Sequence, residues 1–159
     1  MHSAAEQEFM KEAIRLASEN VTHNNGGPFG AIVVKNGEVV GRGFNQVTAS
    51  NDPTAHAEVV AIRDACKNLN TFQLDGCDIY TSCEPCPMCL GAIYWARPDR
   101  IYYGCTKEDA AAIAFDDAFI YEELAVPLGF RKIPTIALSR TAALEAFELW
   151  KNKTDKIAY

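Results

Sequence analysis

The sequence lacks an apolar run of 18 residues, the length at which a segment can cross a membrane as a helix. Its first residues, M-H-S-A-A-E-Q-E-F, also lack the basic stretch followed by an apolar segment that marks a secretory signal. These two absences predict a cytoplasmic protein with no membrane partner. In that reducing compartment, clustered cysteines more often bind metal or take part in chemistry than form disulfides.

Basic residues are also in short supply. The chain has 15 Lys and Arg residues against 21 Asp and Glu residues, a net charge of −6, and no cluster of Lys and Arg. Proteins that hold nucleic acid usually present a basic face to the phosphates. The composition therefore argues against a tRNA or DNA partner. There are no repeats, low-complexity tracts or linkers, so we expect a single domain over residues 1–159.

Helices and strands alternate after an initial hairpin. The hairpin lies within residues 31–45, around Asn36-Gly37, a pair that favours a type I′ turn. Asp52 as N-cap and Pro53 at the first helical position set the expected start of the second helix. The pattern predicts helices over 4–19, 53–67, 85–96, 107–114, part of 117–125 and 142–150, and further strands over 77–82, 100–104 and 133–138. This order predicts an α/β fold, a three-layer α/β/α sandwich with a five-stranded mixed sheet.

The stretch T-S-C-E-P-C-P-M-C-L-G at 81–91 contains three cysteines. Cys86 and Cys89 are three positions apart in the first turn of a predicted helix, so their sulfurs can reach one ion. A helix N-terminus stabilises the thiolate, the form that binds zinc. A C-x-x-C pair also serves redox chemistry, but thioredoxin-like motifs normally follow the first strand of their fold, and this pair follows the third.

His56 and Glu58 stand near the start of the other well-marked helix. If both helix starts point at one place, His56, Cys86 and Cys89 supply three zinc ligands and leave a fourth position for water or hydroxide, the arrangement of catalytic zinc. Glu58 would then move the proton of that water to the substrate. Two readings stay open: Glu58 as an ordinary solvated glutamate, and a closed, non-catalytic site in which Cys83 is the fourth ligand.

T-A-H-A-E at 54–58 followed by P-C-P-M-C at 85–89 resembles the H-x-E and P-C-x-x-C signature of the zinc deaminases in the cytidine deaminase superfamily. G-G-P-F-G-A at 26–31, N-D-P-T-A-H-A-E at 51–58, F-D-D at 115–117 and the final Tyr159 further resemble the small bacterial guanine deaminases. The resemblance covers nearly the whole chain. It implies hydrolysis of guanine to xanthine and ammonia with one Zn²⁺ per chain. Guanosine, cytosine, an amino-triazine and tRNA adenosine remain alternative substrates.

The resemblance also assigns residues. Asp117 becomes a second acid that handles the leaving amine or orients the ring, although an aspartate there could equally cap the following helix. By the resemblance, Asn45 forms hydrogen bonds with the edge of the purine; the alternative is an asparagine that only stabilises a turn. Phe29 stacks on the base by the same resemblance; the alternative is ordinary packing in the core. The backbone N–H near Ala57 is expected to stabilise charge on the substrate.

The C-terminal tail at about 151–159 is polar until its last three residues. The resemblance implies a homodimer in which the subunits exchange C-terminal segments. In that arrangement Tyr159 closes the active site of the partner subunit and excludes water.

Overall fold

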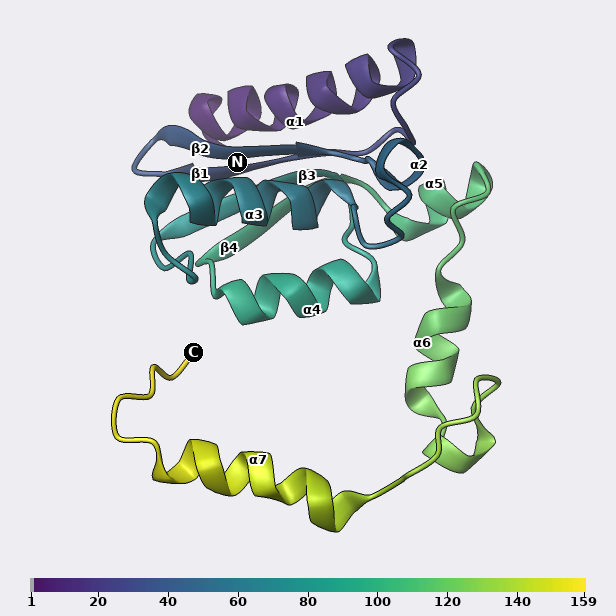
Figure 1. Cartoon of the computed structure of the whole chain (residues 1–159). Coiled ribbons are helices and arrows are strands. Elements are labelled where there is room, and N and C mark those ends of the chain that lie inside the picture. Colours follow the sequence, from purple (N-terminus) through teal and green to yellow (C-terminus); the bar gives the residue numbers. More distant parts are fainter. Residues whose placement is uncertain (1) are drawn as a thin grey trace. The chain divides into compact units, whose positions relative to one another are not determined.

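A four-stranded mixed sheet organises the first of the two units into which the chain divides (Figure 1). The computed structural model describes residues 2–159. Its strands are β1 (Gly30–Lys35), β2 (Glu38–Phe44), β3 (Cys77–Cys83) and β4 (Arg100–Cys105), in the order β2-β1-β3-β4. β1 pairs antiparallel with β2 and β3, whereas β3 and β4 are parallel. Asn36 and Gly37 both have positive φ, 52° and 81°, as the expected type I′ turn requires.

Helices cover both faces of this sheet. α1 (Ala4–Thr22) packs on one face, and α3 (Ala57–Leu69) and α4 (Pro87–Ala96) lie on the other (Figure 1). Ile32 and Val34 of β1 are buried with α1, while the alternate residues Ala31 and Val33 are buried with α3. Burial on both faces explains why β1 reads as an unbroken apolar run. The predicted three layers are therefore present in the first unit.

Contact between α3 and β2 is unusually close because small residues meet there. A Cβ built on Gly41 would lie 2.6 Å from both Ala61 O and Ala65 Cβ, and one on Gly43 would lie 2.5 Å from Ala61 N. Ala57, Ala61 and Ala65 of α3 are fully buried against this surface. The backbone of β2 therefore sets how near the first turn of α3 comes to the sheet.

The second helix starts later than the sequence predicts. α3 begins at Ala57 rather than at 53, with His56 as its N-cap. The reason is local: Asp52 Oδ1 accepts hydrogen bonds from Thr54 N at 2.8 Å and Thr54 Oγ1 at 2.7 Å, which closes a turn instead of opening a helix. α4 likewise begins at Pro87, two residues later than expected.

The predicted strand at 133–138 is wrong for the described chain, and the sheet has four strands instead of five. Strand formation needs a neighbouring strand for its backbone hydrogen bonds, and none of the described residues pairs with this segment. Its apolar side chains are instead exposed: Ile133 is 79 % exposed and Leu138 is 86 % exposed.

The remaining elements follow the expected order with shifted bounds. In α1 the predicted capping box is confirmed, since Glu6 N donates to Ser3 Oγ and Ser3 N donates to Glu6 Oε2. The short helix α2 (Val47–Ser50) and the 3₁₀ turn η1 (Leu128–Phe130) had no counterpart in the sequence analysis. The other helices are α5 (Lys107–Ala112) in the first unit and α6 (Ala118–Ala125) and α7 (Arg140–Asn152) in the second.

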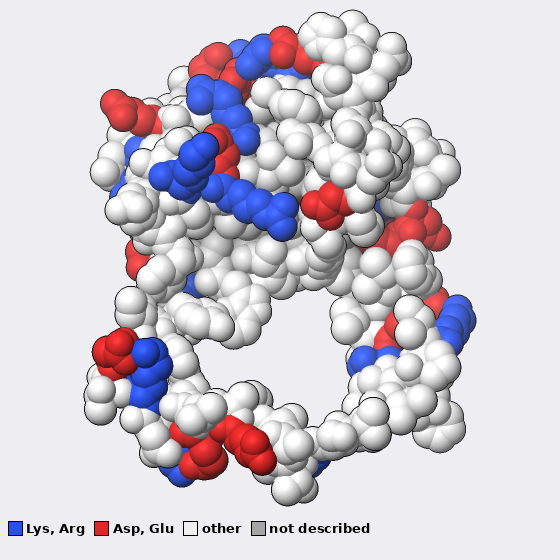
Figure 2. All heavy atoms as spheres, viewed as in Figure 1, with Lys and Arg blue, Asp and Glu red and all other residues white. Residues whose placement is uncertain are grey.

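Charges of both signs are interspersed on the surface of the first unit. On the face drawn in Figure 2, Lys and Arg side chains lie among Asp and Glu side chains over the region of α1. Arg15 lies 2.8 Å from Glu12, and Glu12 also lies 3.2 Å from Arg42 of β2. Among residues 2–159, no helix combines the length and the apolar character needed to cross a bilayer.

Gly43→Ala should lower the free energy of unfolding by about 1–3 kcal/mol, because the new methyl group must push α3 away from β2. Gly91→Ala is the matched control. Gly91 lies within α4 with no atom in the way of a Cβ, so the change should raise helix stability by about 0.5–1 kcal/mol. Urea unfolding followed by circular dichroism measures both, and equal stability of the two variants would contradict the packing argument.

Candidate metal centre and active site

Two helix starts meet beside the end of β3. His56 is the N-cap of α3 and Cys86 is the N-cap of α4, both with extended backbone, and neither side chain caps its own helix. Pro87 occupies the first turn of α4, where its missing N–H costs no hydrogen bond. Cys89 follows in the same turn and is fully buried. The three side chains are therefore free to face one another.

The ligand atoms of these three residues lie within 4.8 Å of one another. His56 Nδ1 is 3.6 Å from Cys86 Sγ and 3.5 Å from Cys89 Sγ. Tetrahedral zinc with its usual bond lengths separates a sulfur and a nitrogen ligand by about 3.6 Å. The donor set and its spacing therefore fit one zinc ion, and the structure brings together the three residues that the sequence predicts as its ligands, His56, Cys86 and Cys89.

The pKa values of the two thiols are shifted in opposite directions. A hydrogen bond from Cys89, followed by the His56 ring, lowers the pKa of Cys86 to about 4. The same hydrogen bond, together with burial, raises the pKa of Cys89. The contact with Cys86 also raises the pKa of His56. Cys86 is thus a thiolate at neutral pH, the form a metal binds.

Glu58 lies at the second position of α3, next to this cluster. Its side chain is only 6 % exposed, and burial raises its pKa. Cys89 Sγ donates to Glu58 Oε2 at 3.4 Å, so one carboxylate oxygen already contacts a metal-binding residue. The open reading of a solvated glutamate is therefore wrong. A buried carboxylate with a raised pKa beside a metal site suits proton transfer.

Cys83 is turned away from the cluster. Its thiol donates to Thr106 O at 3.5 Å, and its strand position pairs with Cys105 of β4. Burial raises the pKa of Cys83 to about 11, which keeps it a neutral thiol. The cluster that the described residues form consists of three ligands without it.

Asp117 is the last residue of the first unit and directly precedes α6. Partial burial and then the negative charge of Cys86 raise its pKa. The role expected of Asp117 in handling the leaving amine stays a prediction.

Asn45 and Phe29 are joined by their backbones. Asn45 N donates to Phe29 O at 3.1 Å, and Asn45 Oδ1 accepts from Val47 N at 3.2 Å. Gln46 N donates to Ala55 O at 2.9 Å, which fixes this segment to the chain just before His56. Tyr159, in contrast, belongs to the second unit and is 72 % exposed, so its expected role stays a prediction.

Sequence reasoning missed two buried residues that support this site. Asn20 of α1 donates through Nδ2 to Gly27 O at 2.8 Å and to Asn45 O at 2.9 Å, while its Oδ1 accepts no hydrogen bond from the described residues. Thr81 Oγ1 lies 3.5 Å from Glu58 Oε1 and donates to Cys83 O at 2.9 Å. The sequence signal for both residues was a polar side chain among apolar ones, Asn20 on the buried face of α1 and Thr81 in β3.

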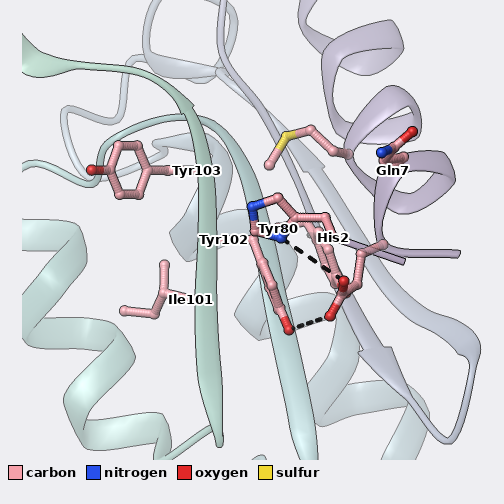
Figure 3. Close-up of a pocket in the computed structure, with 8 residues that line it drawn as sticks. His2, Gln7, Tyr80, Ile101, Tyr102 and Tyr103 are labelled. Atoms are coloured by element: carbon pink, nitrogen blue, oxygen red, sulfur yellow. Dashed lines mark hydrogen bonds and ion pairs between the residues drawn. The ribbon is translucent and has the colours of Figure 1, made fainter. Parts of the chain in front are cut away.

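A groove of about 480 Å³ lies on the opposite face of the sheet (Figure 3). Its floor includes Tyr80 and Tyr102, whose rings stack with centroids 4.5 Å apart, and Tyr102 Oη donates to Glu6 Oε1 at 2.8 Å. Tyr80 faces α1, whereas its neighbour Thr81 contacts Glu58 on the other side. The groove is therefore separate from the metal cluster.

Cys83→Ser should retain one zinc ion per chain, because the Cys83 thiol contacts Thr106 O and is not one of the three clustered ligands. Cys86→Ser should lose stoichiometric zinc, since it removes the ligand that is already ionised. Elemental analysis after dialysis against a weak chelator gives both values. Loss of zinc from the Cys83 variant would revive the closed site with four protein ligands.

Comparison with known proteins agrees with this geometry. The signature described as the cytidine and deoxycytidylate deaminase zinc-binding region matches residues 3–105. A guanine deaminase of Bacillus subtilis is 54 % identical over 151 residues, which are 95 % of this chain and 97 % of that relative. The X-ray structure of guanine deaminase from Bacillus subtilis matches with a TM-score of 0.94 at 54 % identity, covering 96 % of this chain and 98 % of that one. A tRNA-specific adenosine deaminase of Aquifex aeolicus is 42 % identical over 95 residues, 60 % of this chain and 62 % of the relative. The chain belongs to the cytidine and deoxycytidylate deaminase family.

Proposed function

We propose that this chain is a zinc-dependent guanine deaminase, which hydrolyses guanine to xanthine and ammonia. One observation carries the proposal: the buried carboxylate of Glu58 contacts a cluster of three residues that fits zinc. The guanine deaminase of Bacillus subtilis, similar over 95 % of the chain, supports the choice of substrate. The tRNA-specific relative matches only 60 % of the chain, and the net charge of −6 gives no support to a polyanionic substrate.

His56, Cys86 and Cys89 would hold the zinc ion, which when bound would supply Lewis acidity and lower the pKa of a water molecule toward neutrality. Glu58 accepts the proton of the attacking water, because its carboxylate borders the cluster and burial keeps its pKa above the ordinary value. It then returns that proton to the ring nitrogen as C2 becomes tetrahedral, and afterwards passes the proton of the added hydroxyl to the exocyclic amine as the C2 carbonyl of xanthine forms. A new C–O bond forms at C2 of guanine, the C2–N bond breaks, and ammonia leaves.

Asp117, Asn45 and Phe29 bind and orient the base in this proposal. Asp117 holds or protonates the leaving amine, which its raised pKa favours. Asn45 uses its Oδ1 for Val47 N, so the NH₂ end of its amide serves as the donor to the purine edge. Phe29 stacks on the ring. The N–H of Ala57, in the first turn of α3, has no partner within its helix and faces developing negative charge.

We further infer that the active form is a homodimer with exchanged C-terminal units. β4 is the outer strand of the described sheet, so one of its edges has no partner strand among residues 2–159. The segment 133–138 forms no strand, and α7 has no buried residue. Large apolar side chains are exposed along this unit: Ile133, Ile136, Leu138, Phe147, Leu149 and Trp150. A soluble chain rarely leaves so much apolar surface uncovered.

Residues 133–138 of a second copy fit this open edge as a fifth strand beside β4. The apolar side of α7 from the same copy would cover the groove between α1 and β4, where Met10, Tyr80 and Tyr102 contribute apolar surface (Figure 3). Exchange of an identical element is a low-cost route to a dimer. The exchange would also bring the partner's tail, with its terminal tyrosine, toward the site as a lid that excludes water.

Turnover of guanine tests the proposed function directly. Zinc-loaded protein should convert guanine to xanthine with release of ammonia, and do so faster than it acts on guanosine, cytosine or an adenosine-containing tRNA stem-loop. Glu58→Gln should keep one zinc per chain and lower kcat by about 10²–10⁴-fold, since the amide cannot accept the proton. The control is Glu84→Gln. Glu84 lies in the connection between β3 and α4, where its carboxylate accepts a hydrogen bond from Lys107 N.

No turnover of guanine by fully zinc-loaded parent protein would refute the guanine deaminase. Full activity of Glu58→Gln would refute only the role of Glu58.

Mixed dimers test the exchange. A chain lacking its last three residues should be nearly inactive yet folded, because only the lid is lost. Co-expressing it with Glu58→Gln should restore about a quarter of the parental activity, since random pairing lets the intact Glu58 of one copy meet the intact tail of the other. Absence of any recovery, with mixed dimers shown by mass spectrometry, would mean that the tail acts within its own chain.

A further inference from the structure

The rings of Phe29 and Phe115 meet edge to face. Their centroids are 4.9 Å apart and their planes are inclined by 89°. Phe29 belongs to the loop before β1, whereas Phe115 follows α5. The contact therefore joins two segments that are far apart in the sequence. Aromatic pairs of this geometry attract each other beyond the effect of burying their surface.

The loop before β1 is shaped around this pair of rings. A Cβ built on Gly27 would lie 3.2 Å from Phe115 Cζ and 3.3 Å from two ring carbons of Phe29. Such distances are tighter than ordinary contact, so a side chain here would press on both rings. Phe29 N also donates to Gly27 O at 2.8 Å, which folds the loop back on itself. The absence of a side chain at position 27 thus makes room for Phe115.

The residue before Phe115, Ala114, has a left-handed backbone conformation. Ala114 has φ of 71°, a conformation that costs an alanine free energy because its Cβ crowds the backbone. The turn is held by hydrogen bonds from Ala114 N to Ala111 O at 3.1 Å and from Phe115 N to Ala110 O at 3.0 Å. A strained backbone conformation persists where the packing of the surrounding residues fixes the course of the chain. Here the turn presents the Phe115 ring to Phe29.

Both ends of this contact carry residues that the proposed function uses. Asp117 lies two positions after Phe115 in the sequence. Phe29 is hydrogen-bonded through its backbone to Asn45. The ring of Phe115 therefore contacts the side chain that is proposed to stack on the base, and it belongs to the segment that leads to Asp117.

We propose that Phe115 is a positioning residue for base binding: it holds Phe29 in the orientation that stacks on guanine. The inference rests on the proposed function. Phe115 acts through Phe29 and not on the substrate directly, so it should affect how tightly the base is held rather than the chemical step. Phe115 is 45 % exposed, so its removal should leave the fold intact.

Steady-state kinetics on guanine with zinc-loaded variants test this. Phe115→Ala should raise KM about three- to tenfold and change kcat less than about twofold. Phe72→Ala is the matched control, since Phe72 is 55 % exposed and lies in the connection between α3 and β3, at the other end of the strand from the cysteines. It should leave KM unchanged. Zinc content and Tm of each variant confirm that the site and fold persist.

A double variant shows whether the effect passes through Phe29. If it does, Phe29→Ala with Phe115→Ala should have the same KM as Phe29→Ala alone, because no ring is left to position. An unchanged KM in Phe115→Ala, or a double variant whose KM is the product of the two single effects, would overturn the inference. These results leave the proposed function standing as long as the parent protein turns over guanine. A parent that does not turn over guanine overturns the proposed function, and the inference with it.

Discussion

Close packing of α3 on β2 is the constraint on which the site depends. With only glycine at positions 41 and 43, the backbone of the strand touches the alanine face of the helix. The first turn of α3 is thereby fixed in depth, and this turn carries both His56 and Glu58. A helix displaced outward by one methyl group would carry the histidine away from the two cysteines. The smallest side chains in the core thus set the distances in the metal cluster.

The cluster combines charges that would be costly if each were buried alone. Two thiols, an imidazole and a carboxylate share one small volume, and Glu58 and Cys89 are almost completely buried. Each group is stabilised by a neighbour: Cys86 by the Cys89 thiol and the His56 ring, and Glu58 by the hydrogen bond from Cys89. A divalent cation suits such a place, because its charge compensates the thiolates it binds.

Local patterns in the sequence were enough for the metal cluster but not for all of the fold. The spacing of Cys86 and Cys89 and the position of His56 at a helix start depend on short-range geometry, which sequence shows. The predicted helix start at 53 was wrong because the side chain of Asp52 accepts a hydrogen bond from Thr54 N instead of capping a helix. The prediction of a strand at 133–138 was wrong because a strand needs hydrogen bonds to another strand that can be distant in sequence. None of the described residues pairs with this segment. Phe115 stood within the quoted F-D-D motif, yet its contact with Phe29 joins segments on separate elements.

His56, Glu58, Cys86 and Cys89 lie at one end of the sheet, where β1 begins and β3 ends. At the other end, the turn at Asn36-Gly37 and the connection at Gly76 have no atoms within 4 Å of where a Cβ would stand. Both glycines adopt positive φ in open turns. Such turns tolerate added chain, because insertion there breaks no packing. The hairpin tip is therefore a natural place to attach a tag, a fluorophore or a fused domain without touching the chemistry at the opposite end.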